Sequence, residues 1–186
     1  MNELTQVLSD ATAAIADTYF HLRLDGGSPV YRERVYCYEL YHQMRSRWPE
    51  GTSYILNGEV DKAAHPILRR LGADHVKPDL LVHRPGYMSG NFAVIEVKSS
   101  DAPTIGIKKD LKNLSLFIKT VGYKRAIYLI YGYGADDTKI EQIRRIAGEI
   151  CEMAPIELWT HQQANIKAIF RDVVGCNNLQ PNNQAT

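Results

Sequence analysis

The stretch KPDLLVHRPGYMSGNFAVIEVKSS, residues 77–100, decides the fold of this 186-residue chain. Two short apolar runs, residues 79–83 and 92–98, have the composition of β-strands. The segment between them is rich in Gly and Pro, so we expect an antiparallel hairpin with a long turn. Three charged residues lie in the two runs, where packing alone would favour apolar side chains: Asp79, Glu96 and Lys98.

The second run predicts a central strand with a charged site on one face. Alternation along a strand places Phe92, Val94, Glu96 and Lys98 on one face and Ala93, Ile95 and Val97 on the other. Both faces begin apolar, so we expect both to be covered and Glu96 to be partly buried. An unpaired buried carboxylate costs several kcal/mol, so such a group is paired or binds a metal ion. A structural ion pair between Glu96 and Lys98 is one reading.

Asp79 favours the other reading, a metal site. Antiparallel pairing places the start of the first strand beside the end of the second, so we expect Asp79 near Glu96 and Lys98. Crowded carboxylates repel each other unless a cation lies between them. Oxygen ligands of this kind suit Mg²⁺ or Mn²⁺.

The hydrophobic periodicity of the chain predicts the remaining elements. We expect helices at residues 2–22, 31–47, 105–121 and 137–151, and further strands at 53–60, 125–131 and 156–160. This order predicts an α/β (α+β) fold with a central mixed β-sheet and helices on both faces. We expect a single domain over residues 1–176, with a helical addition at 1–30, a core at about 31–160 and a flexible tail at 177–186.

Pro78-Asp79, followed after sixteen residues by Glu96-Val97-Lys98, resembles the motif of the PD-(D/E)xK (restriction-endonuclease-like) nuclease superfamily. The helix at 31–47, which carries Glu39 in YELYHQ, also resembles that superfamily. The element order over about 31–131, roughly half of the chain, is similar to its αβββαβ core.

The resemblance implies a metal-dependent nuclease, a deoxyribonuclease that hydrolyses phosphodiester bonds in defence, repair or recombination. Asp79, Glu96, Glu39 and the backbone carbonyl of Val97 would hold Mg²⁺ or Mn²⁺. Lys98 would orient or help to deprotonate the attacking water, or stabilise charge in the transition state. Two alternatives stay open: a catalytically silent protein of this fold that binds nucleic acid or protein, and an α/β protein in which Glu96 and Lys98 form an ion pair.

Two further groups of charges are candidates for this site. Lys108, Lys109 and Lys112 follow the motif on a helix and are predicted to contact DNA phosphates, with a solvated helix face as the alternative. Glu59 and Asp61, at the end of the strand predicted at 53–60, could approach the metal, although a solvated strand end is the simpler reading.

Composition restricts the partners and the compartment. The net charge of +1 gives no global attraction to nucleic acid or membranes, so a DNA partner requires a local basic patch. We find no signal peptide and no apolar run of membrane-spanning length, and therefore expect a cytoplasmic protein without a membrane partner. The three cysteines have no C-x-x-C spacing. The sequence leaves open endonuclease or exonuclease, DNA or RNA, one metal or two, and whether a homodimer or a partner protein selects the target.

Overall fold

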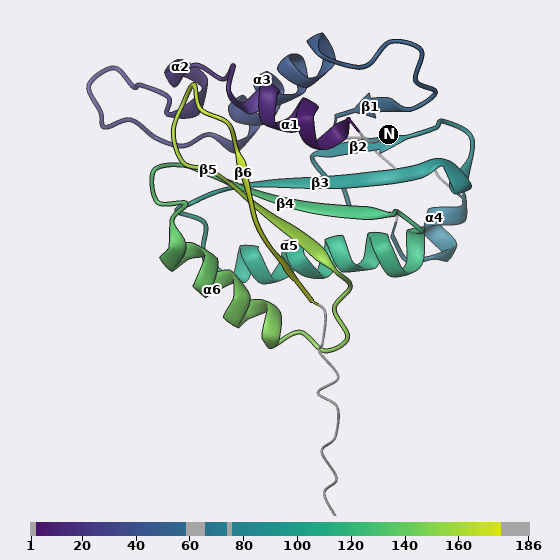
Figure 1. Cartoon of the computed structure of the whole chain (residues 1–186). Helices are drawn as coiled ribbons and strands as arrows, with labels where there is room; N and C mark the ends of the chain where they lie inside the picture. Colours follow the sequence, from purple (N-terminus) through teal and green to yellow (C-terminus); the bar gives the residue numbers. More distant parts are fainter. Residues whose placement is uncertain (1–2, 59–65, 74–75, 176–186) are drawn as a thin grey trace, which may run out of the picture.

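A six-stranded mixed sheet forms the centre of the computed structural model, which describes residues 3–58, 66–73 and 76–175 (Figure 1). The strands lie in the order in which they follow in sequence: β1 (Ile55–Asn57), β2 (Leu80–His83), β3 (Asn91–Ser99), β4 (Arg125–Tyr131), β5 (Ile156–His161) and β6 (Ile169–Val174). β3, β4 and β5 are parallel, whereas β1, β2 and β6 each pair antiparallel with their neighbours. The predicted mixed sheet is confirmed, and so is the antiparallel pairing of β2 with β3.

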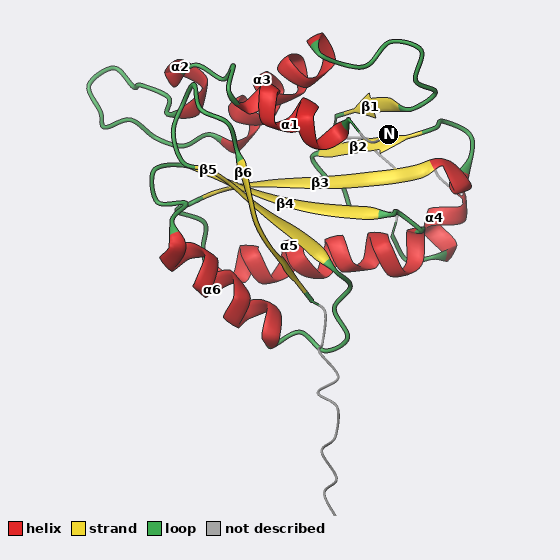
Figure 2. Ribbon diagram, viewed as in Figure 1, coloured by secondary structure: helices red, strands yellow, loops and turns green. Residues whose placement is uncertain are grey.

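Helices cover both faces of this sheet (Figure 2). One face packs against α1 (Leu4–Thr12), α2 (Asp17–Phe20) and α3 (Glu33–Ser46). The other packs against α4 (Pro66–Arg70), α5 (Thr104–Leu116) and α6 (Asp137–Gly148). Two short helical segments complete the chain, η1 (Met88–Gly90) before β3 and η2 (Phe117–Val121) after α5. The sheet therefore separates two hydrophobic cores.

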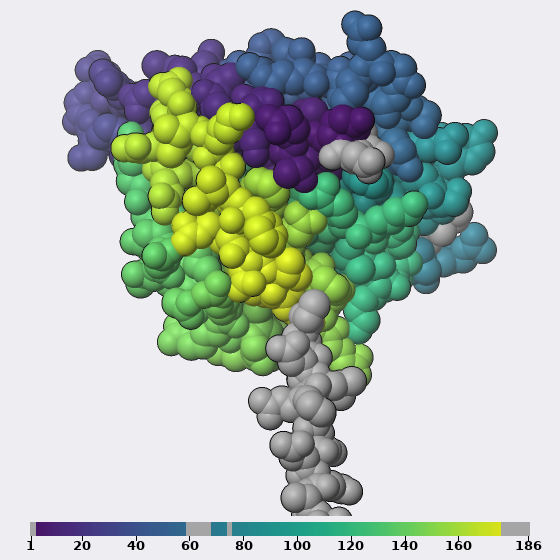
Figure 3. All heavy atoms as spheres, in the orientation of Figure 1, coloured from purple at the N-terminus to yellow at the C-terminus, as the bar shows by residue number. Residues whose placement is uncertain are grey.

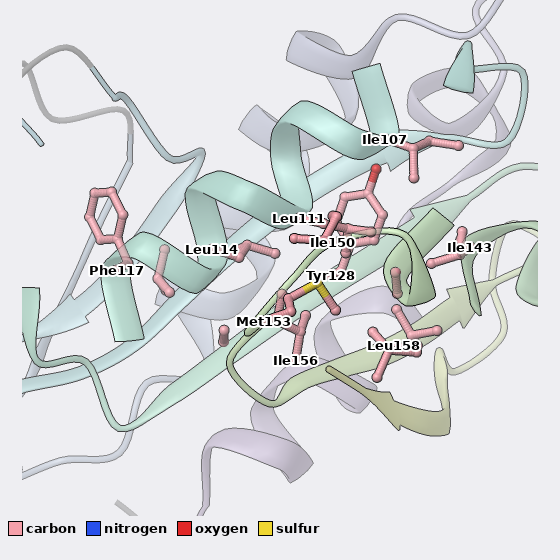
Figure 4. Packing of buried hydrophobic residues seen from close by; sticks show 14 of the residues in the cluster. Ile107, Leu111, Leu114, Phe117, Tyr128, Ile143, Ile150, Met153, Ile156 and Leu158 are labelled. Carbon is pink, nitrogen blue, oxygen red and sulfur yellow. The ribbon is translucent and has the colours of Figure 1, made fainter. Parts of the chain in front are cut away.

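The core beneath α5 and α6 follows from their apolar periodicity (Figure 4). The buried positions of α5 include Ile107, Leu111 and Leu114, and those of α6 include Ile140, Ile143 and Ile146. Residues three and four apart share one face of a helix, so these side chains meet the sheet together. The burial of these residues agrees with the hydrophobic periodicity from which both helices were predicted.

The opposite core is rich in aromatic side chains. The rings of Tyr36 in α3 and Tyr131 in β4 stack at 3.9 Å, and Phe20 in α2 contacts both edge-on. Tyr36 Oη and His161 Nδ1 share a buried hydrogen bond of 2.7 Å. These contacts attach the start of α3 to the ends of β4 and β5.

The prediction of one helix over residues 2–22 is wrong, because the chain turns between α1 and α2. The hydroxyl of Thr12 donates to backbone carbonyls of α1 and accepts from the backbone N–H of Ala168. The carbonyl of Ile15 accepts from the backbone N–H of Asn165. The segment between β5 and β6 thus bonds to the Thr12 side chain and to the Ile15 carbonyl, which a continuous helix would use for its own hydrogen bonds.

Two elements, α4 and β6, were not predicted. β6 forms an edge of the sheet and lies on the surface, where Figure 3 shows it in yellow. Its exposed Ile169, Phe170 and Val173 weaken the alternation that usually marks a strand. The strand predicted at 53–60 is shorter, at Ile55–Asn57. The last residues of that prediction and the predicted tail at 177–186 lie outside the described residues.

Candidate active site

The β2–β3 hairpin brings together the two parts of the motif. Leu80 pairs with Ile95, so Asp79 lies just before the ladder, beside the second half of β3. The backbone N–H of Val97 donates to Asp79 Oδ2 at 2.8 Å. Val97 stands between Glu96 and Lys98 in the chain, so the predicted proximity of Asp79 to both is borne out by the geometry.

Lys98 is bound by carboxylates from both helical layers. Its Nζ lies 3.0 Å from Glu33 Oε1, in the first turn of α3, and 3.3 Å from Asp110 Oδ2, in α5. The side chain of Lys98 is 17% exposed, and that of Asp110 is 7% exposed. The hydroxyl of Tyr128, in β4, donates to the same oxygen of Asp110 at 3.4 Å. The ion pairs of Lys98 are therefore made across the end of the sheet, and Glu96 is not one of the two carboxylates that make them.

Burial and the charges of neighbouring acids raise the pKa of three acids near Lys98, namely Asp79, Glu96 and Asp110. Burial raises the pKa of Asp79 to about 7, and the charge of Glu33 adds to the rise, although the hydrogen bond from Val97 opposes it. Burial also raises the pKa of Glu96, and the charges of Asp79 and Asp110 act in the same direction. The pKa of Asp110 is raised by burial and lowered in part by Lys98. A carboxylate loses favourable hydration in such a place, so each of these acids holds its proton more strongly than in water.

Lys98 itself is held in its charged form. Burial alone would lower the pKa of its ammonium group, but the adjacent charges of Asp110 and Glu33 outweigh burial and raise that pKa. A protonated lysine donates hydrogen bonds and cannot accept a proton. The ion pairs of Lys98 therefore hold it as a cation and a hydrogen-bond donor.

A pocket of about 610 Å³ opens between α3 and the start of β2, and gives solvent and ligands access to part of this site. Its lining includes Glu33 and Asp79, together with Cys37 and Tyr38 of α3 and Asn57 of β1. Burial raises the pKa of the Cys37 thiol, which disfavours the thiolate form that acts as a nucleophile. Cys37 therefore contributes to the pocket as a lining residue.

The donor set fits a metal ion that keeps part of its hydration shell. Within residues 3–58, 66–73 and 76–175, no group of three or more His, Cys, Asp or Glu side chains is arranged to hold a metal ion. The charge of Asp79 nevertheless adds to the raised pKa of Glu96, so these two carboxyl groups lie near each other. Mg²⁺ typically binds one or two carboxylates and completes its octahedron with water and substrate oxygens. Two carboxylates and a backbone carbonyl are enough for such a site.

Glu39, the helical carboxylate suggested by the resemblance, lies on a different side of α3 from Glu33. Six residues correspond to a rotation of about 240° at 3.6 residues per turn. Glu39 Oε1 accepts a hydrogen bond of 2.6 Å from Gln43, one turn further along. The carboxylate of α3 that the structure brings to Lys98 is Glu33.

The predicted phosphate-binding lysines lie on the side of α5 that faces away from the sheet. Lys109 and Lys112 are exposed, whereas Lys108 forms a 2.8 Å ion pair with Glu149. Asp110 points from the same helix toward the sheet. The three lysines therefore lie on the helix whose Asp110 contacts Lys98, but on its opposite side. Glu59 and Asp61 lie outside the described residues.

Sequence reasoning missed two residues of the site, Glu33 and Asp110. A signal for Asp110 exists, because it is the one acid in residues 105–121 and shares the spacing of Ile107, Leu111 and Leu114. An acid on the apolar face of a helix indicates a buried cation or metal nearby. Glu33 has no comparable signal, since an acid in the first turn of a helix is common without any further role.

Comparisons with known proteins add little to this geometry. No protein-family model and no curated protein sequence matches the chain. Among solved structures, the chain is similar to Pyrococcus furiosus SfsA in complex with Ca²⁺, at 15% identity and a TM-score of 0.37 over 83% of this chain and 75% of that one. A TM-score this low carries no argument about function. No helix within the described residues is long and apolar enough to cross a membrane.

Proposed function

We propose that this chain is a metal-dependent nuclease of the PD-(D/E)xK type that hydrolyses phosphodiester bonds in DNA. One observation carries the proposal. Asp79 is hydrogen-bonded to the backbone of Val97, between Glu96 and Lys98, at the end of a central strand. Two acids and a lysine from adjacent strands thereby share one site that a pocket reaches through Asp79.

Asp79, Glu96 and the carbonyl of Val97 are the residues that would hold Mg²⁺ or Mn²⁺. When bound, such an ion polarises a phosphate and lowers the pKa of a coordinated water. Carboxylates this close together repel each other, which raises the free energy of the site when it holds no cation. Binding of a cation relieves this repulsion and is therefore favoured.

Lys98 supplies a fixed positive charge in this proposal. Its ammonium group is held in one position by Glu33 and Asp110. A preorganised cation stabilises negative charge that grows on phosphate oxygens during hydrolysis. Glu33, rather than Glu39, is the carboxylate of α3 in contact with this lysine, and we assign it the helical role in the site.

Exposed Lys109 and Lys112 are the proposed contacts to the nucleic-acid backbone. Charges of this kind bind phosphates without regard to sequence, and their contribution falls as salt concentration rises. Lys108 contributes less than these two, because Glu149 neutralises it in the free protein.

The test is cleavage of plasmid, linear and single-stranded DNA, and of RNA, with and without Mg²⁺ or Mn²⁺. Wild type would be compared with Asp79→Asn and Lys98→Met, and with Asp172→Asn as a matched control. Asp172 forms an ion pair with Arg144 on α6, outside the site. We expect metal-dependent cleavage that the first two substitutions lower by at least 100-fold and that Asp172→Asn leaves intact, because the first two remove groups of the reaction centre.

A folded wild type that binds nucleic acid and cuts none of these substrates would reject the enzyme and leave the catalytically silent binding module. Cleavage of RNA in place of DNA would keep the reaction and correct the substrate.

A further inference from the structure

Asp110 occupies a position that packing alone would give to an apolar residue. It shares the sheet-facing side of α5 with Ile107, Leu111 and Leu114, and it is only 5% exposed. Keeping an ionised carboxylate in such a place is unfavourable unless a cation and hydrogen bonds compensate for the lost hydration. Asp110 therefore meets a requirement for a charged, hydrogen-bonding group that leucine could not meet.

The compensation comes from the candidate active site. Asp110 Oδ2 accepts from Tyr128 Oη at 3.4 Å and lies 3.3 Å from Lys98 Nζ. Tyr128 is the β4 neighbour of Glu96 in the sheet, so the hydroxyl that orients Asp110 comes from the strand beside the motif. The Oδ2 atom of Asp110 is thus contacted by groups from two adjacent strands, Tyr128 of β4 and Lys98 of β3.

Lys98 would be poorly fixed without this contact. Lysine carries its charge on a flexible four-carbon stem with several rotatable bonds. The second partner, Glu33, has a side chain that is 35% exposed, five times the exposed fraction of Asp110. Glu33 alone could follow Lys98 toward solvent, whereas the buried Asp110 holds the ammonium group at the end of β3.

We infer that Asp110 is a positioning residue for Lys98, which it holds from the α5 side of the sheet in the place from which the lysine acts on the substrate phosphate. This role rests on the proposed nuclease function. Asp110 touches neither substrate nor metal in it and acts through Lys98.

Kinetics of purified variants give the first readout, with Asp110→Asn, Asp110→Glu and the control Asp172→Asn. Misplacement of a reacting group by about 1 Å costs up to about 100-fold in rate. We therefore expect Asp110→Asn to lower kcat by about 10- to 100-fold while KM changes by less than about twofold, since a positioning role affects the transition state more than binding. Asp110→Glu restores the charge and should recover part of the loss.

A second readout is independent of catalysis. In the metal-free protein labelled with ¹⁵N-lysine, the ammonium group of Lys98 should give a resolved ¹H–¹⁵N correlation, because its ion pairs and burial slow proton exchange with water. The signal is assigned by its absence in Lys98→Arg. We expect Asp110→Asn to abolish or broaden this signal and Asp172→Asn to retain it.

These readouts separate the positioning role from the nuclease function. A folded Asp110→Asn variant with an unchanged Lys98 signal, or with unchanged kcat, would overturn the positioning role and leave the nuclease intact. Loss of the signal in a protein whose wild type cuts no nucleic acid would support the positioning and reject the nuclease. If Asp110→Asn does not fold, Tyr128→Phe removes only the hydrogen bond that orients Asp110 and is expected to weaken both readouts in the same direction.

Discussion

Four acids and one lysine meet at the end of β3, and their crowding is the main physical feature of the molecule at the scale of single residues. The acids are Glu33, Asp79, Glu96 and Asp110. Burial and, to a lesser extent, the negative charges of neighbouring acids raise the pKa values of Asp79, Glu96 and Asp110. A site of this kind binds a cation more favourably than it binds water.

Glu33 and Glu39 provide a test of which carboxylate on α3 belongs to the site. Glu33 contacts Lys98, whereas Glu39 bonds to Gln43 on its own helix. We expect Glu33→Gln to lower kcat of the proposed nuclease by about tenfold or more, because removal of a charged hydrogen bond costs about 1.5–3 kcal/mol, and Glu39→Gln to change it by less than about twofold. Steady-state kinetics of the two variants under one set of conditions measures the difference. A larger loss in Glu39→Gln would return the helical role to Glu39, as the resemblance suggests.

His161 makes stability depend on pH. Burial lowers its pKa from 6.5 to about 4. The unfolded chain binds a proton at this histidine below pH 6.5, and the folded protein does not until about pH 4. The free energy of unfolding should therefore fall as pH decreases from 6.5 to 4, by about 3 kcal/mol from this group.

Urea unfolding at several pH values measures this contribution. His161→Gln should remove the fall in stability that this group contributes, whereas the raised pKa values of Asp79, Glu96 and Asp110 act in the opposite direction in both proteins. Loss of the bond to Tyr36 also lowers stability at neutral pH. The exposed His42 provides the control, because His42→Gln should leave the slope unchanged. An equal slope in wild type and His161→Gln would show that other groups cause the acid sensitivity.

At the scale of elements, the site depends on how β2 and β3 pair and on how α3 and α5 are rotated about their axes. The hairpin register brings Asp79 to Val97. The rotation of α5 turns Asp110 inward and leaves Lys109 and Lys112 exposed. Each helix residue is turned by about 100° from the one before, so neighbouring positions in the chain have opposite environments.

The start of α6 depends on a side-chain cap. Asp136 precedes the helix in an extended conformation, and its Oδ1 accepts from the backbone N–H of Lys139 at 3.0 Å. We expect Asp136→Ala to lower the free energy of unfolding by about 1 kcal/mol, since it leaves a helix N–H without this acceptor. Chemical denaturation provides the measurement. Asp136→Ser keeps an oxygen at the cap and should retain most of the stability; an equal loss in both variants would assign the effect to charge rather than to capping.

At the scale of the whole molecule, Lys98 links the two layers that the sheet separates. Glu33 comes from α3 on one face and Asp110 from α5 on the other. The lysine lies near the carboxyl ends of the parallel strands β3 and β4, the edge at which ligands of open α/β sheets commonly bind. A ligand that binds beside Lys98 should therefore stabilise the helices on both faces of the sheet.

A divalent cation should stabilise the whole domain if the proposed site binds it. A ligand that binds only the folded state at ten times its Kd adds about 1.4 kcal/mol, which raises Tm by about 3–6 °C for a domain of this size. We expect Mn²⁺ or Mg²⁺ to raise Tm of the wild type and of Asp172→Asn, but not of Asp79→Asn with Glu96→Gln. Differential scanning calorimetry with and without the cation measures the shift. A shift of equal size in the double variant would place the cation elsewhere.

The sequence by itself determined the class of fold and the central part of the site. The strand Arg125–Tyr131 is confirmed at its predicted bounds, α3 and α6 lie within the predicted helices, and α5 begins one residue before its predicted start, because their hydrophobic patterns are long and regular. The proximity of Asp79 to Glu96 and Lys98 followed from the hairpin, since strand pairing is a local relation.

Only the tertiary structure decided the rest. The break between α1 and α2 depends on hydrogen bonds to Ala168 and Asn165, about 150 residues away in the chain. The partners of Lys98 depend on the packing of α3 and α5 against opposite faces of one sheet. Helical periodicity shows which side of a helix is apolar, but it does not show which of several acids near that side reaches a charge on another element, because that depends on the position of each helix over the sheet.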